Sequence, residues 1–225
     1  MGKRSFITPE QRSGVRARIE PVARAMSRAG LTANQLTLIG FGIAAVGGLL
    51  AAIEWWLLAG IVATVGAAFD LFDGAVARAT NTVSRLGAFM DSTFDRWGEG
   101  IVYIGIVIGA TRAGFDLGAW LAAAALVSAF MVSYARAKSE SLGFSSGTGM
   151  AAVGLAPREV RTVILGIGLV GAGLLGGVGA GLADAGSLIL AASLGLIAVL
   201  ATITVIQRIR FVTAQPLDRE GSQPS

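Results

Sequence analysis

The chain has 225 residues, of which 54% are hydrophobic and only 14% are charged, and its mean hydropathy is +0.70. Soluble domains carry about a quarter charged residues, so this composition indicates a membrane protein. The absence of cysteine and histidine excludes disulfides, thiol catalysis, imidazole acid-base chemistry and the usual zinc sites. In a chain this apolar, the net charge of +4 favours an anionic lipid surface or a phosphorylated substrate over nucleic acid as the partner.

Residues 1–30 are polar and basic and precede the first apolar run, so we interpret them as an N-terminal juxtamembrane segment. Within this segment, four apolar residues recur at helical spacing: Val15, Ile19, Val22 and Met26. The pattern predicts an amphipathic helix, kinked at Pro21, that lies in the membrane interface. A soluble amphipathic helix would show the same pattern, but the apolar runs that follow directly favour the interfacial position.

Six apolar runs follow, at residues 36–53, 55–69, 101–111, 117–135, 162–183 and 187–206. A helix needs about 20 residues to cross a hydrocarbon core of ~30 Å, and the first run and the last three reach or nearly reach this length. The sequence therefore predicts an all-α integral membrane bundle of six transmembrane helices. This bundle would form one domain at residues 31–211, followed by a cytoplasmic tail at residues 212–225.

The second and third runs are too short to cross the membrane unaided. At 1.5 Å per residue, run 55–69 reaches only ~22 Å, so its helix must continue about five residues past Asp70. Run 101–111 reaches only ~16 Å, so its helix must begin near Asp91. Both extensions place acidic residues at or just inside one membrane face, where a charge is costly unless it is paired or faces a wet cavity. These acids are therefore candidates for function.

The basic residues predict the orientation. With six spans, both termini lie on one side of the membrane, and all 18 basic residues except Arg112 fall on that side. Cytoplasmic loops carry an excess of lysine and arginine. We therefore expect a multi-pass protein of the cell membrane, with both termini and the active site facing the cytoplasm.

Four aspartates form two pairs with helical spacing. Asp70 and Asp73 are three residues apart, and Asp91 and Asp95 are four apart, so each pair projects from one face of its helix. The turn between the helices makes them antiparallel, so that the pairs can face each other. Four converging carboxylates need cations, because like charges in a partly dry site raise one another's pKa. Hard oxygen ligands suit Mg²⁺ or Mn²⁺, and paired carboxylates suit two ions about 3.5–4 Å apart.

A structural ion cluster is the alternative, in which Arg78, Arg85 and Arg96 supply the positive charge. Gly74 and Gly87 weigh against it, because they remove side chains where a ligand would need to approach the backbone. The aspartates are also compatible with two further alternatives. An intramembrane prenyltransferase also sets aspartate-rich helices against a metal-bound diphosphate, and an intramembrane cation transporter would use acids within glycine-rich helices.

The motif Asp70-x2-Asp73-Gly74-x2-Ala77-Arg78-x8-Gly87-x3-Asp91-x3-Asp95 resembles the signature of the CDP-alcohol phosphotransferase (CDP-alcohol phosphatidyltransferase) family. All eight defining positions match without a spacing error. Residues 31–37 resemble the family's LTPNxxT segment, with Ala33 in place of the frequent proline. The resemblance covers most of the chain and lies nearest to the branch of the phosphatidylinositol phosphate and archaetidylinositol phosphate synthases. It implies the same six-helix fold and a homodimer.

The resemblance also implies the reaction and the site. A substituted phosphate passes from a CDP-linked lipid such as CDP-diacylglycerol to an alcohol, and CMP is released. Two Mg²⁺ or Mn²⁺ ions would be held by Asp70, Asp73, Asp91 and Asp95, and Asp95 would also act as the general base. The nucleotide of the CDP-lipid would be bound by Asn34, Thr37, Asp73, Gly74, Ala77, Arg78, Ser84 and Gly87.

A second group of basic residues predicts where the acceptor's phosphate binds. These residues flank the helix ends on the side of the aspartates: Arg136, Lys138, Arg158, Arg161 and Arg208. Cations at these positions resemble the inositol-phosphate-using branch and predict inositol 1-phosphate as the acceptor. Glycerol 3-phosphate or another alcohol remains an alternative, because a glycerol phosphate would need the same charges. For Arg210 and Arg219, anchoring at the cytoplasmic face is the preferred interpretation.

Overall fold

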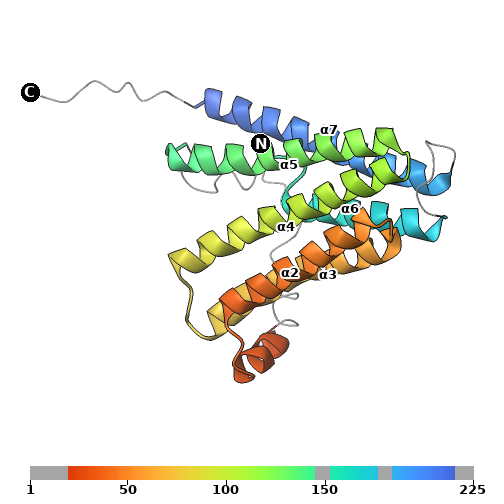
Figure 1. Cartoon of the computed structure of the whole chain (residues 1–225). Helices are drawn as coiled ribbons and strands as arrows, with labels where there is room; N and C mark the ends of the chain where they lie inside the picture. Colours follow the sequence, from red (N-terminus) through yellow and green to blue (C-terminus); the bar gives the residue numbers. More distant parts are fainter. Residues whose placement is uncertain (1–19, 145–152, 177–183, 216–225) are drawn as a thin grey trace, which may run out of the picture.

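A computed structural model of the chain describes residues 20–144, 153–176 and 184–215. Within these ranges the protein is all-helical and contains no strand, as predicted. A short helical segment at residues 20–28 precedes six longer helices (Figure 1). These are α2 (Ala33–Ala52), α3 (Trp56–Ala79), α4 (Arg85–Arg112), α5 (Asp116–Ser141), α6 (Arg158–Leu174) and α7 (Ala185–Thr213).

The two short apolar runs extend into long helices. α3 continues nine residues past Asp70 to Ala79, which confirms the predicted extension. α4 begins at Arg85, six residues before the predicted start near Asp91. The reason is local, because Ser84 caps α4 by accepting a hydrogen bond from the backbone N–H of Gly87 at 3.0 Å. Asp91 and Asp95 therefore lie in the second and third turns of a helix rather than at its beginning.

The last two helices differ from the predicted runs at their ends. α6 starts at Arg158, four residues before the run, and ends at Leu174, nine residues before the predicted end. Gly176 has φ of +108°, a conformation that favours glycine and that commonly terminates a helix. The rest of the predicted span, residues 177–183, lies outside the described residues. α7 runs to Thr213 and so extends past the predicted end at residue 206.

The helices pack closely because glycines remove side chains at their contacts. α2 packs against α3 and α4, α6 packs against α3 and α7, and α5 packs against α4 and α7. A Cβ atom added to Gly105 on α4 would overlap the carbonyl of Gly48 on α2, and one added to Gly109 would overlap the carbonyl of Ala51. Small residues allow membrane helices to approach at the backbone. The abundant glycines are therefore packing residues, at least along the α2–α4 contact.

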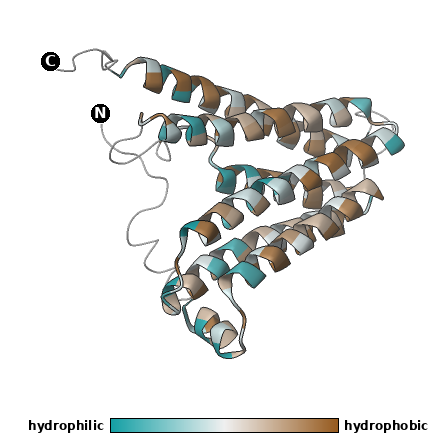
Figure 2. Cartoon of the chain, turned by 60° about the vertical axis from the view of Figure 1, so that its left-hand side comes forward, coloured by the Kyte–Doolittle hydropathy of each residue, from teal (hydrophilic) through white to brown (hydrophobic). Residues whose placement is uncertain are grey.

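Four of these helices are long and apolar enough to cross a membrane: α2, α3, α5 and α7. The other two fall short for different reasons. α6 has only 17 residues in the described part, and the first half of α4 carries Asp91, Asp95, Arg96 and Glu99. Hydrophobic residues cover the middles of the helices, and hydrophilic residues gather toward their ends (Figure 2). A multi-pass membrane protein is therefore supported, with four of the six predicted spans identified.

The N-terminal segment is described only in part. Residues 20–28 are helical, and Ala23 is fully buried against Leu36 and Val76. This contact fixes the segment against the beginning of α2 and the end of α3. Residues 1–19, which include Val15 and Ile19, lie outside the described residues, so the interfacial position and the kink at Pro21 stay predictions.

Candidate active site

The four aspartates predicted as metal ligands come from two neighbouring helices. α3 carries Asp70 and Asp73, and α4 carries Asp91 and Asp95. α3 and α4 make few direct contacts with each other, whereas α2 packs against both. The space between them is a partly open cavity to which α2 and α6 also contribute. Asp70 and Asp95 line this cavity, so one member of each pair faces the same space.

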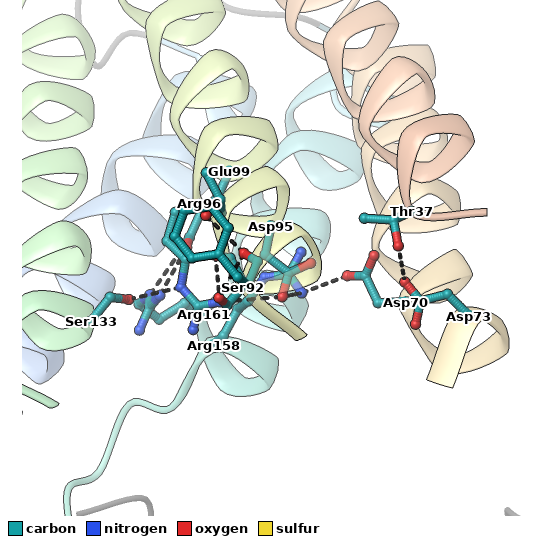
Figure 3. Close-up of polar contacts among 12 residues, drawn as sticks. Thr37, Asp70, Asp73, Ser92, Asp95, Arg96, Glu99, Ser133, Arg158 and Arg161 are labelled. Carbon is teal, nitrogen blue, oxygen red and sulfur yellow. Dashed lines mark hydrogen bonds and ion pairs between the residues drawn. The ribbon is translucent and has the colours of Figure 1, made fainter. Parts of the chain in front are cut away.

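Arg158, the first residue of α6, lies between Asp70 and Asp95 (Figure 3). Its Nη1 atom donates to Asp70 Oδ2 at 2.5 Å and lies 2.9 Å from Asp95 Oδ2. An arginine at this place stabilises two carboxylates that would otherwise repel each other in a partly dry cavity. The second cation is Arg96, whose Nη1 atom is 3.4 Å from Asp95 Oδ2. An ion cluster thus exists, but its main cation is Arg158 rather than Arg78 or Arg85.

Asp73 is held by a side chain from α2. The hydroxyl of Thr37 donates a hydrogen bond to Asp73 Oδ2 at 2.8 Å, and both residues are only 5% exposed. The same hydroxyl lies 3.2 Å from the carbonyl of Ala33 in the preceding turn. Thr37 was predicted to lie near the CDP-lipid. In the structure it fixes the orientation of a predicted metal ligand.

The acidic residues do not converge on a single point. Asp91 and Asp95 both interact electrostatically with Asp70, Arg158 and Arg96, but of the two only Asp95 forms ion pairs with these arginines among the described residues. Across the described ranges, no three acidic side chains come close enough together to hold a metal ion. The donor set still fits Mg²⁺ or Mn²⁺, because four neighbouring carboxylates supply hard oxygen ligands. The binding of two ions stays a prediction.

The residues predicted to bind the nucleotide fall into two groups. At the start of α4, Ser84 caps the helix through Gly87, and a Cβ added to Gly87 would lie 3.5 Å from Asn34 Oδ1 on α2. Toward the end of α3, a Cβ added to Gly74 would lie 3.2 Å from Arg78 Nη1. Both glycines therefore leave room beside a polar side chain. Ala77 lies between Gly74 and Arg78 on α3 and is half-buried.

The residues predicted to bind the acceptor's phosphate differ in their exposure and in their contacts within the protein. Lys138 and Arg136 are exposed near the end of α5, where Arg136 Nε donates to Glu140 Oε1 at 2.9 Å. Arg208 is 4% exposed and donates to the carbonyls of Val153 and Val132. Arg161 is 1% exposed and forms a two-bond ion pair with Glu99. Arg158, Arg136 and Lys138 are thus the more accessible members of the set.

Two residues of this region had no binding or catalytic role in the sequence prediction. Glu99 lies one turn beyond Asp95 on α4 and lines the cavity. Arg96 donates to Ser133 Oγ at 3.3 Å and so links α4 to α5 (Figure 3). The four-residue spacing from Asp91 to Asp95 continues to Glu99 and was the available signal for it. No comparable signal pointed to the contact between Arg96 and Ser133.

Comparison with known proteins identifies relatives along most of the chain. The sequence pattern of the CDP-alcohol phosphatidyltransferase family matches residues 30–209. Archaetidylinositol phosphate synthase of Pyrococcus horikoshii is 37% identical over 205 residues, which cover 88% of this chain and 92% of the relative. Phosphatidylinositol phosphate synthase of Mycolicibacterium smegmatis is 33% identical over 214 residues, which cover 91% of this chain and 88% of the relative.

Two solved structures of phosphatidylinositol phosphate synthase from Mycobacterium tuberculosis resemble the chain. The structure with CDP-DAG bound has a TM-score of 0.77 and 28% identity, and the match covers 91% of this chain and 98% of that one. The structure in complex with manganese and citrate has the same TM-score and identity, with coverage of 90% and 93%. Because the sequence and structural matches both extend over most of its length, the chain belongs to the CDP-alcohol phosphatidyltransferase family.

Proposed function

We propose that this protein transfers the phosphatidyl group of a CDP-linked lipid to inositol 1-phosphate and releases CMP. The hydroxyl oxygen of the acceptor forms a new bond to the lipid-bearing phosphorus, and the bond from that phosphorus to CMP breaks. The names of the relatives from Pyrococcus horikoshii and Mycolicibacterium smegmatis support a phosphorylated inositol as acceptor. The CDP-DAG in the Mycobacterium tuberculosis structure supports CDP-diacylglycerol or a related CDP-lipid as donor.

One observation carries the proposal: the cavity that contains Asp70 and Asp95 adjoins a cluster of arginines. The members interact electrostatically with one another or with these aspartates: Arg96, Arg136, Arg158, Arg161 and Arg208. Within it, Arg136 and Arg158 remain partly exposed, and arginines bind phosphate through charge-assisted hydrogen bonds. Arg158 Nε is moreover a buried donor without a partner among the described residues. The cluster supports a phosphorylated acceptor over a neutral alcohol.

We further propose that Asp70, Asp73, Asp91 and Asp95 hold two Mg²⁺ or Mn²⁺ ions, in line with the manganese in the structure of the relative. Bound divalent ions supply charge neutralisation and orientation of a diphosphate. Asp95 takes the proton of the attacking hydroxyl, since it lies in the cavity beside the arginine that would hold the acceptor. Arg158, with Arg136 and Lys138, binds the acceptor's phosphate.

Residues at the starts of α2 and α4 and toward the end of α3 bind the cytidine and its diphosphate in this proposal: Asn34, Thr37, Asp73, Gly74, Ala77, Arg78, Ser84 and Gly87. Backbone N–H groups and small residues suit a diphosphate that approaches closely. The glycine at position 87 leaves space beside Asn34, and the one at position 74 leaves space beside Arg78. Both spaces open near the aspartates of the same helices.

We propose that all six helices cross the cell membrane, with the active site and both termini on the cytoplasmic side. The aspartates would then lie at the membrane boundary, where a lipid's head group meets a water-soluble alcohol. The distribution of basic residues supports this orientation. The interfacial N-terminal helix and a homodimer complete the proposal.

A panel of acceptors tests the proposed reaction. Detergent-purified protein is incubated with CDP-diacylglycerol, Mg²⁺ and either inositol 1-phosphate, glycerol 3-phosphate or free inositol, and released CMP is measured. We expect CMP release with inositol 1-phosphate and little with free inositol. Faster release with glycerol 3-phosphate would change the acceptor but keep the reaction. No release with any acceptor, together with protection by a prenyl diphosphate alone or with cation flux in vesicles, would contradict the proposed function.

A further inference from the structure

The guanidinium of Arg161 is fully engaged inside the protein. Its Nε and Nη2 atoms donate to the two carboxylate oxygens of Glu99 at 2.9 and 2.8 Å, and its Nη1 atom donates to the carbonyl of Ala156 at 2.9 Å. The side chains of Arg161 and Glu99 are 1% and 7% exposed. Each of the three nitrogens thus has a protein partner. A phosphate would have to break this pair to reach Arg161.

The segment before α6, residues 153–156, is held by Arg161 and by two residues of α7, Thr204 and Arg208. The backbone N–H groups of Leu155 and Ala156 both donate to the hydroxyl of Thr204 at 3.0 Å. Arg208 Nε donates to the carbonyl of Val153 at 3.1 Å, while Arg161 holds the carbonyl of Ala156. Four hydrogen bonds therefore immobilise residues 153–156. Only Pro157 separates this segment from Arg158.

α4 and the first turn of α6 are joined at two levels (Figure 3). Asp95 pairs with Arg158, and one turn deeper Glu99 pairs with Arg161. Residues three or four apart lie on the same face of a helix, so the two pairs stack along one contact. Since the inner pair is bidentate and almost completely buried, it fixes the rotation of the first turn of α6. That rotation sets where the guanidinium of Arg158 lies.

We propose that Glu99 is a positioning residue for the transfer reaction. Through Arg161 and the segment before α6, it holds the guanidinium of Arg158 between Asp70 and Asp95. In this arrangement Arg161 pairs with Glu99 and does not bind the acceptor's phosphate. This revises the role predicted for Arg161 from the sequence. The inference rests on the proposed function, because Arg158 is taken there as a ligand of that phosphate.

The variant Glu99→Gln tests this role, since it removes the charge and keeps the shape. We expect the KM for inositol 1-phosphate to rise about tenfold, because small displacements of a binding group cost rate and affinity steeply. The Kd for CDP-diacylglycerol should stay within about twofold. In an Arg158→Gln background, Glu99→Gln should add no further increase, whereas a general loss of stability would add to it. The matched control is Glu54→Gln, which breaks the exposed pair with Arg112 at 3.5 Å and should leave both constants unchanged.

A lower KM in Glu99→Gln would overturn the inference, because it would mean that the released Arg161 binds the phosphate itself. Additive effects in the Arg158→Gln background would overturn it as well. If Glu99→Gln does not fold, Glu99→Asp keeps the charge with a shorter reach and should raise the KM about threefold. An unchanged KM in that variant would contradict the role.

A second readout does not depend on activity. The chain has no cysteine, so Asp95→Cys with Arg158→Cys gives a unique pair for a short bis-maleimide crosslinker. Adding Glu99→Gln should lower the crosslinking yield at least twofold, and adding Glu54→Gln should not. If the wild type releases no CMP with any acceptor, the proposed function fails, but the yield still decides whether Glu99 positions residue 158. An unchanged yield would overturn the inference.

Discussion

At the scale of single residues, the proposed role of Asp95 as general base combines two demands that are hard to meet together. A general base must lie near the attacking hydroxyl, and it must keep its charge beside other carboxylates. The contacts of Asp95 with Arg158 and Arg96 meet part of the second demand, because each places a positive charge beside the carboxylate. Its position in the cavity answers the first. Arginines from two helices therefore support one carboxylate.

We predict that Asp95→Asn lowers kcat by about 10²–10⁴-fold, the usual contribution of a general base. The amide has nearly the same shape, so the Kd for CDP-diacylglycerol should stay measurable and close to that of the wild type. CMP release and lipid binding check the two expectations. Ser92→Ala is the control, since Ser92 is exposed on the same helix and its hydroxyl bonds only locally, to the carbonyl of Phe89. A fully active Asp95→Asn protein would refute the role of Asp95 as general base.

Thr37 offers a test of the predicted metal site that does not remove a ligand. Thr37→Val deletes the hydroxyl that donates to Asp73 at 2.8 Å and leaves this buried carboxylate free to turn. Residues that orient metal ligands typically contribute 10–100-fold to affinity. We therefore expect the Mg²⁺ concentration for half-maximal CMP release to rise at least about tenfold, while Thr37→Ser stays near the wild type. Equal Mg²⁺ curves for both variants would argue against Asp73 as a ligand.

The sequence relates the four candidate acids to one another more readily than to the cations beside them. Asp70, Asp73, Asp91 and Asp95 lie within 26 positions of one another, so helical spacing alone relates them. Arg158 follows Asp70 by 88 residues, and its place between two aspartates depends on how α6 packs on α3. Periodicity contains no information on such a contact. The resemblance singled out Arg158 as a cation of the site, but not its partners.

At the scale of helices, apolar runs predicted the existence of all six but not their ends. Capping and turn geometry set the ends, as at Ser84 before α4 and at Gly176 after α6. Polar residues also extended α3 and α4 beyond their apolar runs, because a helix in the membrane satisfies its backbone whatever its side chains. The thickness of the membrane correctly predicted that α3 continues past its apolar run. For α4 it predicted a start near Asp91, but the helix already begins at Arg85, with polar residues in its first turns.

Glycines at helix contacts predict a clear stability difference within one pair of helices. Gly105→Ala on α4 would press a Cβ against the carbonyl of Gly48 on α2, and such overpacking costs about 1–3 kcal/mol. We expect a lower Tm in detergent, by about 2–4 °C for each kcal/mol, and reduced CMP release because α4 carries Asp95. Gly42→Ala on α2 is the control, since nothing lies within 4 Å of its added Cβ. A Tm equal to that of Gly42→Ala would contradict the close contact.

At the scale of the whole molecule, the distribution of basic residues and the order of the helices agree on which loops and helix ends share one side. The loop between α3 and α4, the end of α5 and the end of α7 all lie at the left-hand end in Figure 1, and the loop between α4 and α5 lies at the opposite end. Arg112, the one basic residue expected on the other side, is at the end of α4 beside that second loop. The even number of helices therefore returns the chain to the basic side. This agreement favours six crossings, although α6 is short and α4 is partly polar.

The orientation can be tested because the chain has no native cysteine. Thr82→Cys introduces one exposed thiol in the loop between α3 and α4, and Asp116→Cys introduces one at the exposed start of α5. In sealed right-side-out vesicles, a membrane-impermeant maleimide should label Asp116→Cys at once and Thr82→Cys only after detergent is added. Inverted vesicles should give the opposite order, and the wild type should stay unlabelled in both. Labelling of both variants from one side would mean that α4 does not cross the membrane, and the reverse pattern would place the aspartates outside the cytoplasm.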